Sequence, residues 1–207
     1  MLSTLSHPGC TTTEADFRQL RHHTKNALQR ILIQITRCRE LQETVHGQRL
    51  FDDLERRIFL SSTVSDALFG LTGTPGPLAT RLQQLCDALI DLLGDSDQLL
   101  RATVTVDAAV PAVLDDTVLR IAHELVGNAI KHGLYARSVG KITVKVGTGP
   151  GGQVRLQVMD DGWGFGCAPE RGEGMRLAQM LATGCGGTVE LRCGGGLTVA
   201  EATLHPA

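Results

Sequence analysis

Three polar side chains, Glu124, Asn128 and Lys131, follow one another along the chain at intervals of four and three residues. In an α-helix these intervals place all three on one face. A carboxylate, a carboxamide and an ammonium group in one row suit a phosphorylated ligand. Asn128 can offer a hard oxygen to Mg²⁺, Lys131 can neutralise a phosphate, and Glu124 can polarise a nucleophile or a metal-bound water. The same pattern is typical of the solvated face of an ordinary amphipathic helix, so it assigns no function by itself.

Two glycine-rich segments follow this helix. Asp160 stands at the end of an expected strand, and Gly162 and Gly164 come directly after it. A carboxylate at this place can accept a hydrogen bond from the amino group of adenine, and the glycines allow backbone to approach a ligand closely. Gly172 and Gly174 then open a helix, whose first N–H groups could meet phosphates. Taken alone, each segment indicates only a turn.

A third group of polar residues lies near the amino terminus, where His22, Lys25 and Asn26 occur on an expected long helix. The helical spacing turns His22 away from the apolar seam, so its imidazole could act as a nucleophile toward a phosphoryl group. Lys25 adds positive charge beside that group, and Asn26, one turn further on, could orient a water. For an isolated surface histidine, a solvated side chain without a role is the more common interpretation.

The elements that would position these residues form two domains. Residues 1–12 are expected to be disordered, and residues 13–71 to form an antiparallel helical hairpin, from about Thr11 to Val45 and from about Gln48 to Leu71. Each helix has one apolar stripe, with His46-Gly47 breaking the pattern between them, which favours a dimeric four-helix bundle. Residues 72–77 are a Gly- and Pro-rich linker.

Residues 78–207 are predicted to form an α+β two-layer sandwich, with mostly antiparallel strands and helices on one face. The expected helices are Leu78–Leu93, Val113–Leu134 and Gly174–Thr183. The expected strands are Ala102–Val106, Lys141–Val146, Val154–Met159, Thr188–Arg192 and Leu197–Thr203. The last two strands form a closing hairpin around Gly194-Gly195-Gly196.

Composition excludes several classes of partner. The net charge of −2 gives no general attraction to nucleic acid, and one Trp and one Tyr are too few for a base-stacking platform. No apolar run is long enough to span a bilayer, and the first residues do not resemble a signal peptide. Six cysteines without a Cys-x-x-Cys pair, two of them (Cys38 and Cys86) among apolar positions, favour the cytoplasm.

Taken together, these motifs resemble the core of a two-component sensor histidine kinase. The segment Leu20–Gln29 is similar to the phosphoacceptor box of the HisKA_2 class, close to the HWE kinases, with His22 rather than His23 as the phosphoacceptor. His123–Gly133 resembles the N box of the Bergerat, or GHKL, ATPase fold. Asp160-x-Gly162-x-Gly164 and Gly172-x-Gly174 resemble its G1 and G2 boxes.

The resemblance implies that Asn128, Lys131, His132 and the two glycine boxes bind ATP, that Asn128 holds Mg²⁺, and that Asp160 contacts adenine. It also implies a receiver domain of a response regulator as partner and a homodimer formed by the amino-terminal helices. Two departures stand out. The segment Phe165–Arg171 is a very short ATP lid, and only about ten residues precede the first helix, so a separate sensor protein is expected, or the chain is a fragment of a longer kinase.

Three functions are therefore open. The first is a kinase core that autophosphorylates His22 from Mg-ATP and passes the phosphoryl group to an aspartate of a response regulator. The second is a sensorless histidine phosphotransferase that relays phosphate between regulators with little or no use of ATP, which the short lid would favour. The third is a non-catalytic GHKL-type binding protein, against which the intact His22 box argues.

Overall fold

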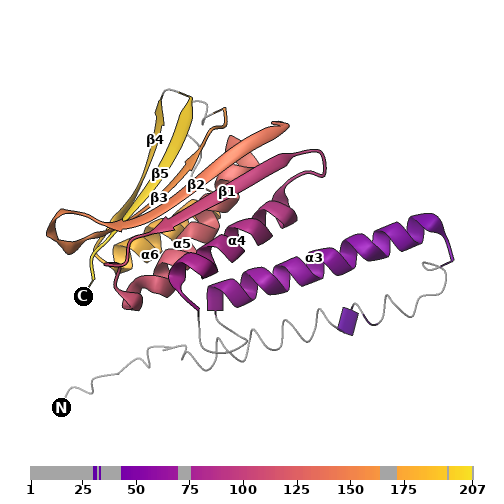
Figure 1. Cartoon of the computed structure of the whole chain (residues 1–207), viewed down its shortest axis with the longest axis horizontal. Coiled ribbons are helices and arrows are strands. Elements are labelled where there is room, and N and C mark those ends of the chain that lie inside the picture. The colour runs from indigo at the N-terminus through magenta and orange to yellow at the C-terminus, as the bar shows by residue number, and fades with distance from the viewer. Residues whose placement is uncertain are drawn as a thin grey trace, which may run out of the picture. The chain divides into compact units, whose positions relative to one another are not determined.

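The computed structural model describes residues 43–69, 76–163, 172–194 and 196–206, together with residues 30, 31 and 33 (Figure 1). The contacts of the chain divide it into two units between Ile58 and Phe59, so that the division falls inside a helix, α3 (Val45–Phe69). The predicted first helix and the predicted linker 72–77 lie almost wholly outside the described residues. The boundaries of the hairpin and linker therefore remain predictions.

The helix α3 begins three residues earlier than expected. Thr44 lies directly before it, and its Oγ1 accepts a hydrogen bond of 3.0 Å from the backbone N–H of Gly47. This is an N-cap, which satisfies one of the free donors in the first turn. The prediction that His46-Gly47 interrupts the helical pattern was wrong, because the cap outweighs the low helix propensity of a single glycine.

The second unit, Phe59–Ala207, contains a five-stranded mixed sheet of order β1-β2-β3-β5-β4. Its strands are Leu99–Val106 (β1), Val139–Thr148 (β2), Val154–Asp160 (β3), Thr188–Gly194 (β4) and Leu197–Leu204 (β5). The β1–β2 pair is parallel and the other three pairs are antiparallel. A parallel pair needs a crossover, and here a helix supplies it.

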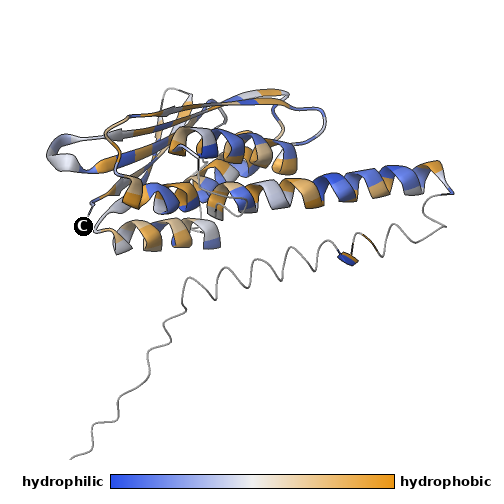
Figure 2. Ribbon diagram, turned by 60° about the horizontal axis from the view of Figure 1, so that its bottom comes forward, coloured by the Kyte–Doolittle hydropathy of each residue, from blue (hydrophilic) through white to orange (hydrophobic). Residues whose placement is uncertain are grey.

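Besides the end of α3, the described α-helices of this unit are α4 (Leu78–Leu93), α5 (Asp115–Asn128) and α6 (Glu173–Gly184), and Figure 1 shows these three on one face of the sheet. A 3₁₀ turn, Ala112–Leu114, precedes α5, and a second one, Pro150–Gly152, joins β2 to β3. Figure 2 shows that the helices each carry both hydrophobic and hydrophilic residues. The predicted α+β layers are therefore confirmed.

The core of the second unit lies between the sheet and these helices. Along β3 every second residue is buried, and Ile142, Val144 and Val146 of β2 face the same layer. The helices contribute fully buried leucines, such as Leu82, Leu85 and Leu89 of α4. Cys86, expected in the core, is fully buried, and burial raises the pKa of its thiol to about 12. Cys38 lies outside the described residues.

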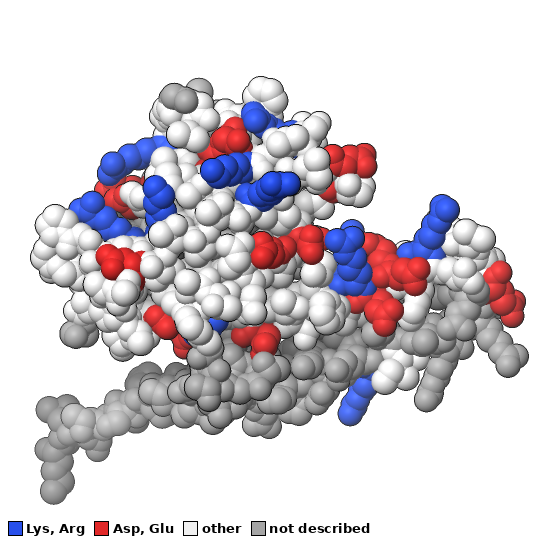
Figure 3. All heavy atoms as spheres, in the orientation of Figure 1, with Lys and Arg blue, Asp and Glu red and all other residues white. Residues whose placement is uncertain are grey.

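The face of the molecule drawn in Figure 3 mixes both signs of charge among the described residues. On the face drawn in Figure 3, Lys and Arg side chains lie among Asp and Glu side chains, and neither sign covers it. Within the described ranges, no helix has the length and hydropathy needed to cross a membrane.

Candidate functional site

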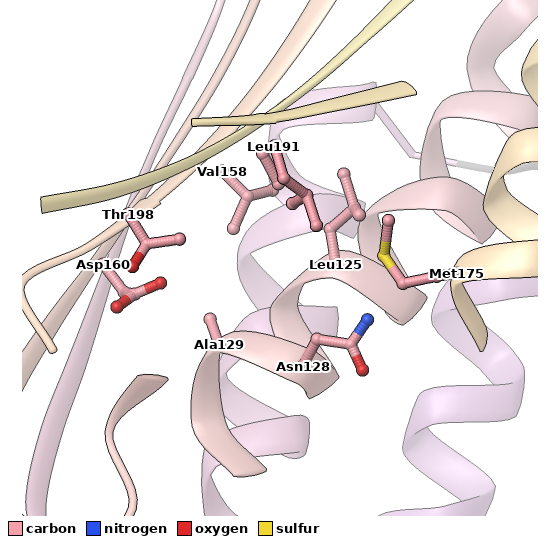
Figure 4. Close-up of a pocket in the computed structure, with 9 residues that line it drawn as sticks. Leu125, Asn128, Ala129, Val158, Asp160, Met175, Leu191 and Thr198 are labelled. Atoms are coloured by element: carbon pink, nitrogen blue, oxygen red, sulfur yellow. The ribbon is translucent and has the colours of Figure 1, made fainter. Parts of the chain in front are cut away.

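A pocket opens where the carboxyl end of α5 meets the sheet (Figure 4). The free space within it is about 10 Å³, which is about enough for one water molecule. The lining is apolar except for three polar side chains, Asn128, Asp160 and Thr198. The apolar lining residues are Leu125, Ala129, Val158, Met175, Leu191 and Ala200. Apolar walls with a few fixed polar groups are typical of a site for a small, partly aromatic ligand.

Asp160 is the buried polar group of this pocket. It is the last residue of β3 and only 3% exposed, and its Oδ1 accepts a 3.0 Å hydrogen bond from the backbone N–H of Gly162. Burial raises the pKa of this carboxyl, while the Gly162 N–H acts in the opposite direction. The carboxylate therefore has remaining acceptor capacity that faces the pocket, where a donor on a ligand would stabilise it.

Thr198 lies opposite Asp160 in the register of β3 and β5, and both side chains point toward the pocket (Figure 4). It is 2% exposed, and its Oγ1 makes no hydrogen bond of good geometry with any described residue, but the hydroxyl lies close enough to Asp160 to lower the pKa of that carboxyl. A well-aligned hydrogen bond to a ligand or a water would satisfy this buried hydroxyl more fully. The sequence analysis missed Thr198. Its signal was the alternation of β5, which places Thr198 in phase with the buried Ala200 and Ala202.

The helix of the N box does not continue as an α-helix to Leu134, as the sequence analysis expected. After Asn128 the chain makes a π-helical turn, Ala129–Gly133, closed by a 2.8 Å hydrogen bond from the Leu134 N–H to the Ala129 carbonyl. One extra residue in the turn shifts everything after Asn128 around the helix axis. Lys131 and His132, both within this turn, are exposed and do not line the pocket with Asn128. Their predicted contacts with phosphate remain a prediction.

The π-helical turn brings Gly133 against the first glycine box. The Gly133 carbonyl accepts a 3.0 Å hydrogen bond from the Trp163 N–H, and the Cα of Gly162 packs on the same carbonyl. A Cβ at Gly133 would stand 2.5 Å from Oδ1 of Asp160, closer than real side chains come. Both glycines are thus needed for the close approach of two loops that hold the carboxylate in place.

This contact makes a pair of alanine substitutions informative. We expect Gly133→Ala to lower the free energy of unfolding by about 1–3 kcal/mol, since the new methyl group must displace the buried carboxylate. Gly127→Ala is the matched control in α5, because its Cβ would meet only Leu93 Cδ1 at 3.8 Å. That change should raise stability by up to about 1 kcal/mol through helix propensity. Urea denaturation measures both, and equal values for the two variants would contradict the packing described.

Glu124 connects α5 with the start of α6. Its Oε1 lies 2.9 Å from Nδ1 of His123, and its Oε2 contacts Gly174, where a Cβ would collide with it. An ionised carboxylate only accepts, so the His123 ring donates this bond. The bond with His123 is the main cause that lowers the pKa of Glu124, and the charge of Lys131 acts in the same direction. Glu124 is therefore a carboxylate at neutral pH.

The start of α6 offers free backbone donors beside Glu124. Gly172 occupies the N-cap position, and no side chain caps this helix. The first N–H groups of an uncapped helix have no intrahelical partner, and the helix dipole favours an anion there. Gly172 and Gly174 therefore lie where the sequence analysis placed them. His22, Lys25, Asn26 and Gly164 lie outside the described residues, so their predicted roles are not addressed by the geometry.

The described part of the second unit is an α+β layer with a buried Asp at a strand end and an uncapped helix start, and comparison with solved structures shows which fold this is. No family model and no curated protein matches the chain. The histidine kinase domain of the Erythrobacter litoralis EL346 blue-light activated histidine kinase is similar in structure, with a TM-score of 0.57 and 23% identity over 93% of each chain. The predicted resemblance is thus confirmed at the level of the fold.

The chain also matches the longer EL346 blue-light activated histidine kinase itself, with a TM-score of 0.55 and 21% identity. It covers 60% of that protein, so it spans less than two thirds of the relative's length. At this identity the likeness supports the fold and leaves the HWE-like subtype undecided.

Proposed function

We propose that this chain is a histidine kinase core that binds Mg-ATP in its second unit, phosphorylates His22 and passes the phosphoryl group to an aspartate of a response regulator. The observation that carries the proposal is the buried Asp160 carboxylate, with the Thr198 hydroxyl beside it, at the polar end of an apolar pocket. The chemistry of the lining suits an adenine ring, because adenine combines two apolar faces with an amino group and ring nitrogens along its edge. The pocket has room for about one water, so it must widen to admit the ring. Asp160 would accept from the amino group, and Thr198 would donate to a ring nitrogen or to a bridging water.

We propose that other residues beside the pocket would hold the phosphates. Asn128 at the pocket wall would offer its side-chain oxygen to Mg²⁺, which usually keeps phosphate and water oxygens as its other ligands. The free N–H groups at the start of α6 would bind the phosphate oxygens. Bound Mg²⁺ would neutralise part of the triphosphate charge. Lys131, exposed and close enough to affect Glu124, would supply further positive charge.

The proposed transfer forms a bond between a His22 ring nitrogen and the γ-phosphorus, and breaks the bond from that phosphorus to the β–γ bridging oxygen, with ADP as the leaving group. The proton of the imidazole must then go to a base. Glu124 suits this role, because the hydrogen bond from His123 holds its carboxyl in the ionised form. Most of the rate would come from positioning and charge neutralisation, as in other phosphoryl transfers.

We further propose that the chain acts as a homodimer through its amino-terminal helices. Among the described residues of the first unit, four large apolar side chains are exposed, Ile31, Ile33, Val45 and Leu50, which supports a second copy as their cover. A dimeric four-helix bundle would bury such side chains. Because the proposed reaction consumes ATP and serves a response regulator, the cytoplasm is its expected location.

The test is incubation of the purified chain with γ-labelled ATP and Mg²⁺. We expect protein-bound label that is labile in acid and stable in base, as a phosphohistidine is, and that moves to a purified receiver domain. If no label appeared but the protein took up phosphate from a phosphorylated receiver, the kinase function would be rejected in favour of the histidine phosphotransferase. Absence of both reactions would leave only a binding function.

A further inference from the structure

Arg81 is a buried arginine in the first turn of α4, far from the nucleotide pocket in sequence. The residue is 6% exposed and lies among the apolar side chains of the core, near Leu78 and Leu82. Its Nε donates to the carbonyl of Ala67 at 3.2 Å, and one terminal nitrogen donates to the carbonyl of Leu68 at 3.3 Å. A buried guanidinium is retained only where its donors are used, and here they are used between elements.

The two carbonyls belong to the last turn of α3. The last four carbonyls of a helix have no partner within it, and the helix dipole places partial negative charge there. The final turn of α3 contains no basic residue of its own. Arg81 therefore supplies, from another helix, both the donors and the positive charge that the end of α3 lacks.

The same guanidinium also reaches α5. Its terminal nitrogen lies 3.1 Å from Oδ1 of Asp116, in the first turn of that helix. The side chain of Asp116 is 76% exposed, whereas that of Arg81 is 7% exposed. The ion pair therefore joins a buried guanidinium to a carboxylate at the surface. α5 is the helix that carries Glu124 and ends at Asn128. One side chain thus fixes the end of α3 to the helix that bears the catalytic and metal-binding candidates.

We propose that Arg81 is a positioning residue, which fixes the direction in which α3 leaves the ATP-binding unit and so sets the rate at which bound nucleotide is brought to His22. This inference rests on the proposed kinase function. Arg81 does not line the nucleotide pocket, so its loss should leave nucleotide affinity unchanged. A small error in position has a large kinetic cost in a phosphoryl transfer that depends on alignment.

The variant Arg81→Met tests this proposal in the full chain. Methionine fills a similar volume, and the exposed Asp116 that it leaves behind is solvated, so the variant should fold. Gln84→Met is the matched control, since Gln84 is an exposed residue of the same helix. We expect the autophosphorylation rate of Arg81→Met at saturating ATP to fall by about 10- to 100-fold, with the dissociation constant for ATP unchanged. Arg81→Lys keeps the charge but loses the planar guanidinium group, whose several N–H donors reach different acceptors. This variant should give an intermediate rate.

Two results would contradict a positioning role for Arg81. The first is an autophosphorylation rate of Arg81→Met equal to that of Gln84→Met. The second is a loss of ATP affinity in proportion to the loss of rate, which would mean that Arg81 stabilises the nucleotide pocket. Amide hydrogen exchange gives a readout that does not require kinase activity: the peptide 59–69 should exchange faster in Arg81→Met, and unchanged exchange would refute the contact. If Arg81→Met fails to fold, the exposed Asp116→Ala must show a lower rate with unchanged ATP affinity, or the proposal fails. An inactive wild type with faster exchange in the variant would refute the kinase function instead.

Discussion

Replacement of His22 by alanine is expected to remove all acid-labile label from the protein incubated with γ-labelled ATP. The reason is chemical: alanine has no nucleophile, and the proposed phosphoryl bond is to the imidazole nitrogen of this one residue. ATP affinity should not change, because the residues that form the pocket all lie in the second unit. The measurement is the amount of base-stable label after a fixed time, together with a calorimetric titration with ATP.

His23→Ala is the matched control, since it removes the neighbouring imidazole on the same expected helix. It should keep most of the label. If His23→Ala abolished the label and His22→Ala kept it, the phosphoacceptor would be His23. The alignment of this segment with the phosphoacceptor box would then be wrong by one residue. If both variants kept the label, a histidine of this segment would not be the acceptor.

The second large effect is expected at Asp160, where Asp160→Asn should weaken ATP binding by about 10- to 100-fold, the loss of one charge-assisted hydrogen bond. The asparagine keeps the shape of the side chain, and its oxygen can still accept from the Gly162 N–H. Its NH₂ group would then face the amino group of adenine, donor against donor. That NH₂ group suits the carbonyl oxygen at the same position of guanine, so the preference for ATP over GTP should shrink.

Stability should change in the opposite direction. Burial raises the pKa of Asp160 above its ordinary value of 3.8. A raised pKa in the folded state means that this group favours folding below its unfolded pKa, and that the contribution is lost as the pH rises through the folded pKa. At neutral pH the carboxylate is therefore ionised at a cost, which asparagine does not have. Asp160→Asn should unfold at an equal or higher urea concentration than the wild type.

Asp161→Asn is the control for this pair of effects. Asp161 is adjacent but half-buried, and its Oδ1 accepts a 2.8 Å hydrogen bond from the Lys141 N–H instead of facing the pocket. Its ATP affinity should stay close to that of the wild type. If Asp160→Asn bound ATP with wild-type affinity, this pocket would not be the adenine site, and the proposed function would be contradicted.

Much of the second unit could be predicted from the sequence alone. The apolar period of α4 predicted its bounds at Leu78 and Leu93, and alternation located all five strands to within a few residues. Local signals suffice for such elements, because the repeat of buried positions is written directly in the residue order. The same holds for Asp160 and for Gly172 and Gly174, whose spacing identified a strand end and a helix start before any contact was known.

The tertiary structure was needed to determine the contacts between segments that are distant in the sequence. A π-helical turn follows Asn128, and its last residue, Gly133, lies against Asp160 and Gly162. Lys131, in the same turn, is exposed and does not line the pocket. Thr198 lies in the pocket because the strand register places it opposite Asp160. The role inferred for Arg81 depends on its hydrogen bonds to the carbonyls of α3. Residue order fixes periodicity, which is local. Close approach and the pairing of buried polar groups depend on which surfaces meet, and that is settled only when the whole unit packs.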